Sequence, residues 1–484
     1  MTDPSHPTYE GAPMATARRR RTFELIALYA TLAAGWVALS RRVVSPLLNR
    51  FFVGASFHDL DGSRLTVWRE SLGAVSIAWM LHLVIVLFLR HWDDRRAEGR
   101  SPADAPRDRL VSPMLILITF VFLAVTVQTG AVHDYIFDLQ IWSEIREGHD
   151  PWFLVIGIYG AYSLNAYGPL FNLLAGLAWV HPLAPKLLLA WAYCLTSCLL
   201  INELRDRRRL GPFATSGVMV WFWNPFPWVE IAIRGHFDIL VGLACVAAVH
   251  ARIRGRDTSS GISLALGVLL KYIPIVLLPF LLLGRDRYRP RLLVAALATI
   301  SLGMGASYLV WGPSLFRPLT LAATRFSTLL SIFRYIRGQY SPFIAILGYA
   351  PNLDQFAVLI LFLGLLRAWS WSRLHRPDPA TAATLAILTT LLLYQNGFPQ
   401  YQMVLFVVAS YWVVRTWDGL RRRRALAVAM GLYFGWLALF DVVYCAVDFG
   451  QTRWEDAVGL PTFLLGFAFL TCLVRSSPSR RWEA

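Results

Sequence analysis

Residues 252–291 read RIRGRDTSSGISLALGVLLKYIPIVLLPFLLLGRDRYRPR. The apolar run 260–283 lies between two arginine clusters, and such clusters mark the cytoplasmic ends of membrane segments. Both clusters fall on one side if the run enters the membrane and leaves again, with the turn at Lys271-Tyr272-Ile273-Pro274. Each half is then too short to cross, because a helical span needs roughly 20 residues. Short half-helices at membrane depth are tolerated where they line protein or water, so this stretch predicts a polytopic membrane protein with an internal cavity.

The composition of the whole chain supports this class. Of 484 residues, 56% are hydrophobic and 16% are charged, and the mean hydropathy is +0.49. Globular proteins carry about 25% charged residues, so little sequence is left for a soluble domain. The composition excludes disordered and collagen-like chains. The five cysteines lie in apolar stretches without metal-type or disulfide-framework spacing, and we interpret them as packed thiols.

The net charge of +16 does not indicate a nucleic-acid protein, because the arginines are not gathered on one face or in one tail. They stand at the ends of apolar segments instead, as the positive-inside rule describes. Residues 1–17 have no apolar core of their own and precede an arginine cluster, which predicts a cytoplasmic tail and not a cleaved signal peptide. The clusters lie at 18–21, 95–96, 205–209, 252–256, 285–291 and 421–424.

Placing these clusters in the cytoplasm predicts about fourteen crossings of the cytoplasmic membrane, with both termini cytoplasmic and residues 132–167 outside. Two short apolar pieces within 168–203 are counted as one broken crossing. The other expected membrane segments are 22–39, 71–90, 110–131, 213–229, 239–251, the re-entrant 260–283, 291–311, 356–371, 380–395, 399–416, 425–444 and 459–474. The domain division that follows is a cytoplasmic tail (1–21), an additional N-terminal hairpin with its cytoplasmic loop (22–109), a transmembrane core with the outer loop 132–167 (110–312), and an outer amphipathic segment with the C-terminal helices (313–484).

The first outer loop carries two acids four residues apart, Asp134 and Asp138, which a helical turn places on one face. A carboxylate beside apolar neighbours such as Trp142 has a raised pKa and suits a general base. Two solvated loop acids, or an acid that caps a short helix, are the alternative interpretation. In an earlier loop, the triplet Asp59-Leu60-Asp61 resembles a metal-binding pair, but it is too short to be specific for a metal site.

The second outer segment contains Glu230, Arg234, His236 and Asp238. Glu230 and Arg234 are four apart, which favours a structural ion pair. Asp238 precedes an apolar span, where an aspartate is a normal helix cap. Alone, this segment is weak evidence of a site.

The third outer segment, 317–339, is cationic and amphipathic, and it is expected to lie on the outer membrane interface. It contains Arg325, Arg334 and Arg337. The planar guanidinium group of arginine matches phosphate oxygens, so these residues predict an anionic partner, either a bound phosphate or lipid headgroups. Lys271 adds a charge at membrane depth, which faces a cavity or a partner. Snorkelling of Lys271 to the interface is the alternative.

Taken in chain order, a set of degenerate motifs within 110–410 resembles the GT-C superfamily of polyprenyl-phosphate-sugar-dependent glycosyltransferases, most closely the mannosyltransferase-like glycosyltransferase family 87. The family has a proline where this chain has Gly168, and residues 1–90 have no counterpart in the pattern. The matching stretches are 137–142 (FDLQIW), 148–152 (GHDPW), 167–170 (YGPL), 224–225 (NP), 235–238 (GHFD), 267–274 (GVLLKYIP), 337–341 (RGQYS) and 396–401 (NGFPQY).

The resemblance implies an all-α, GT-C-like bundle of about 12–14 transmembrane helices with broken helices and extracytoplasmic loop helices. It also implies inverting transfer of a hexose, with mannose favoured, from a polyprenyl-phosphate donor to an extracytoplasmic glycolipid, polysaccharide or protein. Asp138 aligns with the catalytic acid, and Asp134 is then a second carboxylate or an acceptor ligand. The resemblance calls for no cofactor and no metal, although Asp134 and Asp138 allow a divalent ion. Expected donor-phosphate ligands are Arg337, Arg334, Arg325, Lys271 and His236, and expected substrate-binding residues are Trp142, Tyr167, Asp238, Gln339, Gln400 and Tyr401.

Two other functions share some of these features. A transporter or lipid-linked sugar flippase also uses broken helices and an intramembrane lysine, but the acids here cluster in outer loops and no internal repeat is visible. A lipid-to-glycan ligase without an acidic base differs in that Asp138 would be dispensable.

Overall fold

The computed structural model describes residue 27 and residues 111–131, 134–152, 154–156, 162–206, 221, 224–283, 289–324, 326–446 and 456–476. The expected span 22–39 apart from residue 27, the expected span 71–90, most of 213–229, the predicted cytoplasmic tail, Asp59, Asp61 and Arg325 lie outside the described residues.

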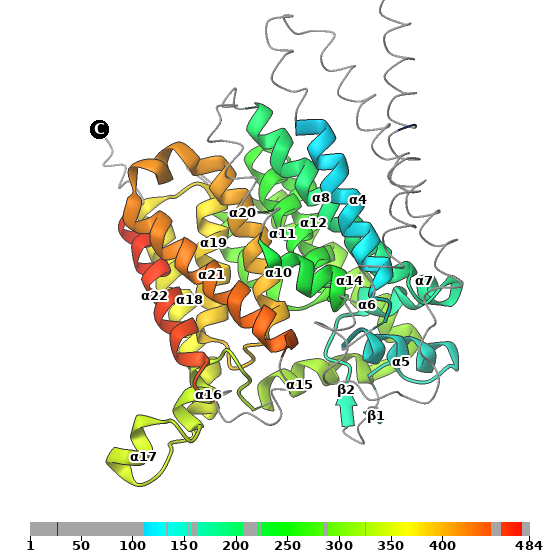
Figure 1. Ribbon diagram of the computed structural model, residues 1–484. Coiled ribbons are helices and arrows are strands. Elements are labelled where there is room, and N and C mark those ends of the chain that lie inside the picture. The colour runs from blue at the N-terminus through cyan, green and yellow to red at the C-terminus, as the bar shows by residue number, and fades with distance from the viewer. Residues whose placement is uncertain are drawn as a thin grey trace, which may run out of the picture.

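The body of the described chain is a helical bundle (Figure 1). Helix α12 packs between α11 and α14, α11 also packs on α20, and α19 lies between α18 and α20. Nearly every residue of α19 is buried, so this helix lies in the middle of the bundle. The long helices are α4 (Val111–Gln128), α8 (Ala184–Asp206), α11 (Asp238–Ile253), α12 (Asp257–Leu270), α14 (Pro290–Trp311), α18 (Ala357–His375), α19 (Pro379–Leu393), α20 (Pro399–Arg422), α21 (Arg424–Ala446) and α22 (Gly459–Ser476).

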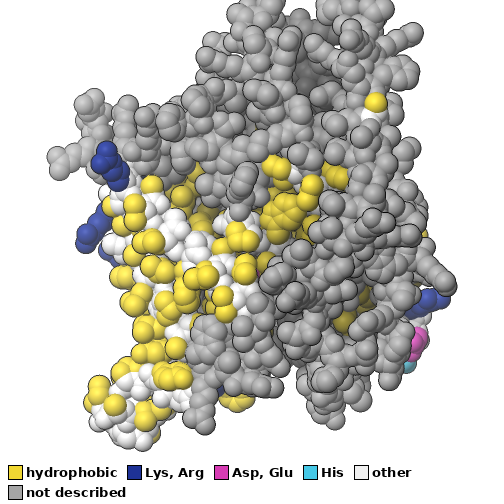
Figure 2. All heavy atoms as spheres, viewed as in Figure 1, with side chains coloured by type: hydrophobic (Ala, Val, Ile, Leu, Met, Phe, Trp, Pro, Cys, Tyr) yellow, Lys and Arg dark blue, Asp and Glu magenta, His cyan; other side chains and the backbone are white. Residues whose placement is uncertain are grey.

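Five helical segments of the described chain are long and apolar enough to cross a membrane, and a sharply bent helix pair makes a sixth. Their outer surfaces carry bare apolar side chains, such as Leu439 on α21 and Phe467 on α22, each more than half exposed. Figure 2 shows apolar side chains over the face where α21 and α22 lie. Water-facing proteins rarely expose such a surface. The predicted class, an all-α polytopic membrane protein, is confirmed, and the count of about 12–14 crossings stays a prediction.

Broken helices occur where the sequence predicts them. In the first, α6 (Pro169–Leu173) and α7 (Ala175–Val180) precede α8, with a break at His181. In the second, α12 ends at Leu270, Lys271 is extended, and the chain resumes as η6 (Ile273–Leu277) and α13 (Leu278–Leu282). Pro274 and Pro279 lack the N–H that a continuous helix needs, which explains why this run does not form one long helix.

A third break precedes α11. The short α10 (Pro225–Pro227) and a π-helix, η5 (Trp228–Ile233), meet α11 at an angle of 120°. Two prolines and the widened π-turn account for the bend, because a π-turn leaves the regular helical hydrogen-bond pattern. Helix η5 packs against α4, α8, α20 and α21, so the bend lies inside the bundle.

The loop elements gather at one end of the bundle, the lower end in Figure 1. The segment 317–339 is not one continuous helix there, because residues 326–331 separate α15 from α16. A hairpin of two three-residue strands, with Leu154 opposite Leu164, adds the only sheet among the described residues. These elements are α5 (Asp134–Arg146), β1 (Leu154–Ile156), β2 (Tyr162–Leu164), η7 (Gly312–Phe316), α15 (Arg317–Thr324), α16 (Ile332–Arg337), α17 (Pro342–Leu347) and η8 (Leu353–Phe356).

Candidate functional site

Helix α5 presents one buried face to the bundle. Tyr135, Asp138, Ile141 and Trp142 lie on that face, at the three- and four-residue spacing of a helix stripe. The Tyr135 hydroxyl donates a hydrogen bond to the carbonyl of Pro182, and the Trp142 indole donates one to the carbonyl of Phe171 at 3.2 Å. These two bonds hold α5 against the broken helix before α8, so that Asp138 points inward.

The Asp138 side chain is buried, with the residue only 4% exposed, and its carboxylate makes no hydrogen bond to any described residue. Burial raises the pKa of Asp138 well above its ordinary range, and the charge of Asp134 raises it further. His236 and Lys271 act in the opposite direction. An acid that is buried, unpaired and close to like charge is the arrangement expected of a general base.

Asp134 has a different environment on the same helix. Its side chain is 32% exposed, and its Oδ2 lies 3.0 Å from His236 Nε2 and 3.4 Å from Gln400 Nε2. Residues from α5, from the turn before α11 and from the start of α20 therefore meet at one carboxylate. These contacts bring together three of the sequence-predicted site residues.

Lys271 meets an acid instead of reaching for the membrane surface. Its Nζ lies 2.6 Å from Asp238 Oδ1, and both side chains are buried. The ammonium also stands 3.7 Å from the centre of the Tyr401 ring, with Tyr167 and Phe237 at 5.6 Å and 5.4 Å. The partner expected for this lysine is present, and the snorkelling interpretation is wrong.

Lys271 lies where the break after α12 contacts the start of the broken helix α6–α7. The Gly168 N–H donates to the carbonyl of Leu270 at 2.9 Å, and a Cβ at Gly168 would collide with the carbonyl of Leu269. A proline at position 168 could not make this contact, because proline has neither the N–H nor the small size that the contact needs. The contact fixes the end of α12, and with it Lys271, against the start of α6.

The arginines of the segment 317–339 form a neighbouring cluster with acidic partners. Arg334 Nε lies 2.5 Å from Asp456 Oδ1, and Arg337 lies 3.0 Å from Asp354 Oδ2. The backbone N–H of Gln339 donates to Asp456 at 3.2 Å. These contacts link the three residues to Asp354 and Asp456, whereas the contacts described above link Asp134, His236, Asp238, Lys271, Gln400 and Tyr401 around α5.

A backbone connection nevertheless ties the arginine segment to the carboxylate site. Leu330 N–H donates to the carbonyl of Gly397 at 2.8 Å, and Thr328 N–H donates to that of Gln395 at 3.1 Å. Gly397 precedes Gln400 by three residues. Helix α16 therefore starts beside the irregular stretch that leads into Gln400 and Tyr401.

Sequence reasoning missed two parts of the site. Glu230 forms the expected ion pair with Arg234 at 2.6 Å, but it also contacts His236 Nδ1 at 2.5 Å. Arg234 in turn lies 2.8 Å from Asp441 on α21. Asp441 stands alone among apolar residues in an expected span, and an acid at that depth marks a partner or a functional site, so a signal for it was available.

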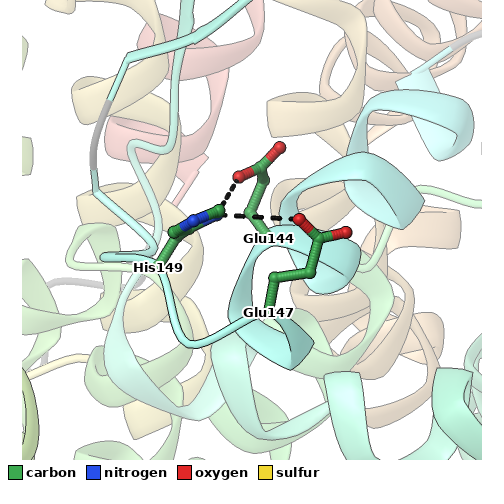
Figure 3. A group of neighbouring side chains, drawn as sticks. All are labelled: Glu144, Glu147 and His149. Atoms are coloured by element: carbon green, nitrogen blue, oxygen red, sulfur yellow. Dashed lines mark hydrogen bonds and ion pairs between the residues drawn. The ribbon is translucent and has the colours of Figure 1, made fainter.

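A separate group of side chains at the end of α5 has the spacing of a metal site. Figure 3 shows Glu144, Glu147 and His149 turned toward one another, with His149 Nδ1 2.6 Å from Glu144 Oε2. All three are at least partly exposed. A surface ion pair explains these contacts, and the group is distinct from the Asp134–Asp138 pair.

Comparison with known proteins identifies the class. Residues 166–394 match the family model of glycosyltransferase family 87. Residues 166–394 therefore form a domain of glycosyltransferase family 87, a GT-C membrane glycosyltransferase family. His236 and Lys271, together with Arg337 of the neighbouring cluster, lie within the matched residues, whereas Asp134, Asp138 and Gln400 lie outside them. No curated protein matches the sequence.

Proposed function

We propose that the protein transfers a hexose, with mannose favoured, from a polyprenyl-phosphate-linked donor to an acceptor hydroxyl on the extracytoplasmic side of the cytoplasmic membrane. The acceptor is a glycolipid, a polysaccharide or a protein. Both termini are cytoplasmic in this proposal, and the end of the bundle that bears α5, α15 and α16 faces outward.

The observation that carries the proposal is the contrast between Asp138 and the other acids of the site. Asp134 and Asp238 each have a cationic or amide partner within 3.4 Å, whereas Asp138 has none among the residues the structure describes. An unpaired buried carboxylate lowers stability and persists where function requires it. Asp138 is thus the group best suited to take a proton from a bound hydroxyl.

In the proposed reaction the acceptor oxygen attacks the anomeric carbon while the bond from that carbon to the donor phosphate oxygen breaks. Asp138 receives the hydroxyl proton, and the polyprenyl phosphate leaves as a monoester. Because the oxygen enters opposite the leaving phosphate, the anomeric centre is inverted. General-base assistance of this kind contributes about 10²–10⁴-fold.

The departing phosphate gains negative charge, so cationic groups near it stabilise the transition state. His236 and Lys271 are the candidates beside the acids, and Arg334 and Arg337 are the candidates on α16, with Arg325 in the same segment. No metal ion is needed where a phosphate meets such cations. The apolar tail of the donor is expected beside the broken helices at 168–185 and 260–283, and Trp142, Tyr167, Gln339, Gln400 and Tyr401 are expected to line the substrate site.

The test is sugar transfer by the purified protein in detergent or liposomes, with a short-chain polyprenyl-phosphate mannose compared with a nucleotide mannose as donor. A crude glycolipid extract supplies the acceptor. The variants are Asp138→Asn and the matched control Glu144→Gln, an acid on the exposed face of the same helix. We expect transfer from the lipid donor alone, with loss of transfer in Asp138→Asn and retention in Glu144→Gln.

Normal transfer by a folded Asp138→Asn would overturn the assignment of the base and favour a ligase that needs no acid. Transfer from the nucleotide donor would overturn the donor class. Movement of the lipid donor across liposomes without transfer would favour a flippase.

A further inference from the structure

The segment from Trp228 to Asp238 folds so that its own charged side chains meet. Helix η5 is a π-helix, and beyond it the His236 N–H reaches back to the carbonyl of Glu230 at 2.8 Å. Gly235 makes this reversal possible with φ +74°, a conformation that costs glycine little. The Tyr135 ring covers Gly235 closely enough that a Cβ would come within 2.8 Å of it. His236 is therefore locked above Glu230 and beside α5.

The result is a continuous line of charged groups through the bundle. Asp441 contacts Arg234 at 2.8 Å, and Arg234 contacts one oxygen of Glu230 at 2.6 Å. The other Glu230 oxygen lies 2.5 Å from His236 Nδ1, and His236 Nε2 lies 3.0 Å from Asp134. All of these side chains are buried except that of Asp134, which is about one-third exposed. The line thus starts in the protein interior and ends at the site.

Each nitrogen of the His236 ring faces a carboxylate. An ionised carboxylate only accepts hydrogen bonds, and a neutral imidazole has a single N–H. Both contacts are satisfied together only when the ring carries two N–H groups, that is, when it is an imidazolium. His236 in this state has no lone pair with which to accept a proton, so it cannot serve as the base of the reaction.

We propose that Glu230 is a positioning residue that holds His236 as an imidazolium with its Nε2–H directed toward Asp134 and the donor phosphate. This inference rests on the proposed function, because it assigns His236 the task of a fixed positive charge beside a lipid-linked phosphate. Arg234 and Asp441 support Glu230 from behind. The positive charges of Arg234 and His236 thus each lie against buried acidic side chains.

Other charged groups also surround His236 and bear on its protonation. Asp134 and Asp138 face it from α5, and both favour the imidazolium by attraction. Loss of Glu230 alone should therefore weaken the protonated state of His236 without abolishing it. The remaining charged or titratable groups near this segment are Tyr135 of α5, Lys186 of α8, Asp238 of α11, Lys271 (which pairs with Asp238), Tyr401 of α20 and Asp441 of α21.

The direct test measures the protonation of His236 and needs no enzyme activity. The imidazole C2 hydrogen exchanges with deuterium at a rate that depends on whether the ring is protonated, and mass spectrometry of the peptide reports it at each pH. We expect the midpoint for His236 to lie at least one pH unit lower in Glu230→Gln than in the wild type. Asp441→Asn, which leaves Glu230 and its bond to His236 in place, is expected to move the midpoint much less.

The kinetic test uses the same variants. At pH 6, where an ordinary histidine is largely protonated, Glu230→Gln is expected to bind the lipid donor nearly as well as the wild type. Between pH 6 and pH 8.5 the donor KM of Glu230→Gln is expected to rise at least tenfold relative to the wild type. A merely structural defect would change kcat and KM at every pH. Glu230→Asp keeps the negative charge on a shorter side chain, so its rise in donor KM with pH should lie between those of the wild type and Glu230→Gln.

The two proposals fail in different ways. If the wild type transfers no sugar from the lipid donor, the proposed function is wrong, while the exchange midpoint still reports on Glu230 and His236. If the wild type transfers sugar and the midpoint of His236 is the same in Glu230→Gln, the positioning role is wrong. If Glu230→Gln does not fold, Glu230→Asp takes its place. The positioning role of Glu230 is then wrong if Glu230→Asp leaves the exchange midpoint of His236 unchanged and its donor KM does not vary with pH.

Discussion

His236 Nε2 lies 3.0 Å from Asp134 Oδ2, although 102 positions separate the two residues in the chain. The same oxygen lies 3.4 Å from the Gln400 amide. One aspartate of α5 is therefore held by two donors, and the other aspartate, Asp138, has no hydrogen-bond partner among the described residues. Two carboxylates one helical turn apart thus have different environments, which separates their roles.

This difference predicts different kinetic effects for the two acids. Asp138→Asn is expected to lower kcat by about 10²–10⁴-fold, because the general base is lost. Asp134→Asn is expected to act mainly on KM, because it loosens His236 and Gln400 without removing the base. Steady-state kinetics with the lipid donor measure both. A larger loss of kcat in Asp134→Asn than in Asp138→Asn would reverse the assignment.

The environment of Asp138 also predicts how activity depends on pH. Burial raises the pKa of Asp138 well above its ordinary range, and Asp134 raises it further. A base must be ionised to accept a proton, so kcat/KM should fall about tenfold for each pH unit below that raised pKa. Asp134→Asn removes one source of the shift and should move the acid limb of the profile to lower pH. An unmoved limb in a folded Asp134→Asn would contradict this.

The same pKa direction predicts that the catalytic acid lowers stability. In the unfolded chain Asp138 ionises near pH 3.9, whereas in the folded protein its raised pKa delays ionisation. The unfolded state therefore binds fewer protons between the two pKa values, and stability falls as pH rises through that window. Asp138→Asn should accordingly melt at a higher temperature than the wild type above the window and show no advantage at pH 4. A thermal unfolding series over pH tests this.

The Lys271–Asp238 pair predicts a rescue experiment. Removing one member of a buried ion pair leaves an uncompensated charge and costs about 3–5 kcal/mol, whereas replacing both members is often nearly neutral. Lys271→Met should therefore reduce the yield of folded protein, and the double variant Lys271→Met with Asp238→Asn should restore it. Size-exclusion profiles and thermal melts compare the three. Equal yields of the single and double variants would mean that the pair does not hold the break at Lys271.

Gly168 offers a sharper test of the contact between the start of α6 and the end of α12. A methyl group there would collide with the Leu269 carbonyl, whereas Gly176, a few residues on, has open space around it. Gly168→Ala should lower the melting temperature clearly and reduce activity, because the end of α12 that carries Lys271 must shift. Gly176→Ala, in the short helix α7, should leave both nearly unchanged. Similar effects of the two substitutions would remove the special role of Gly168.

The sequence predicts the helices well and the outer segments less well, for a physical reason. Apolar runs flanked by arginine fix where a membrane helix lies, so α14, α18, α21 and α22 occur where they are expected. The segment 317–339 has a continuous amphipathic pattern, yet it breaks at 326–331 because its backbone bonds to residues 395–397. That pairing spans more than sixty residues and leaves no local signature.

The candidate site follows the same division. Chain order and motif spacing single out Asp134, His236, Lys271 and Gln400 before their contacts are known. The role of Glu230 is hidden because a four-residue spacing to Arg234 already explains it, and its second partner depends on the π-helix and on Gly235. Asp441 lies 207 positions from Arg234, so only packing of α21 against η5 reveals that pair.

Arg337 allows a donor ligand to be separated from a structural residue. It pairs with Asp354 at 3.0 Å and lies 4.9 Å from the Phe326 ring. If Arg337 holds the donor phosphate, Arg337→Gln should raise the donor KM about tenfold or more, since a charge-assisted bond contributes roughly 1.5–3 kcal/mol. Arg337→Lys should recover little, because lysine lacks the planar fork. The matched control is Arg373→Gln, because Arg373 is an exposed arginine in the last turn of α18.

Asp354→Asn decides between the two roles of Arg337. The substitution breaks the ion pair from the acidic side and leaves the guanidinium in place. If Arg337 serves the phosphate, its positive charge is then less compensated, so the donor KM of Asp354→Asn should stay equal to that of the wild type or fall. The alternative is a purely structural role, in which the Arg337–Asp354 pair only joins the two ends of the segment 337–354 that carries α17. In that case Asp354→Asn and Arg337→Gln should impair stability and activity alike. Parallel measurement of melting temperature and donor KM separates these outcomes, because a binding role moves the two variants in opposite directions and a structural role moves them together.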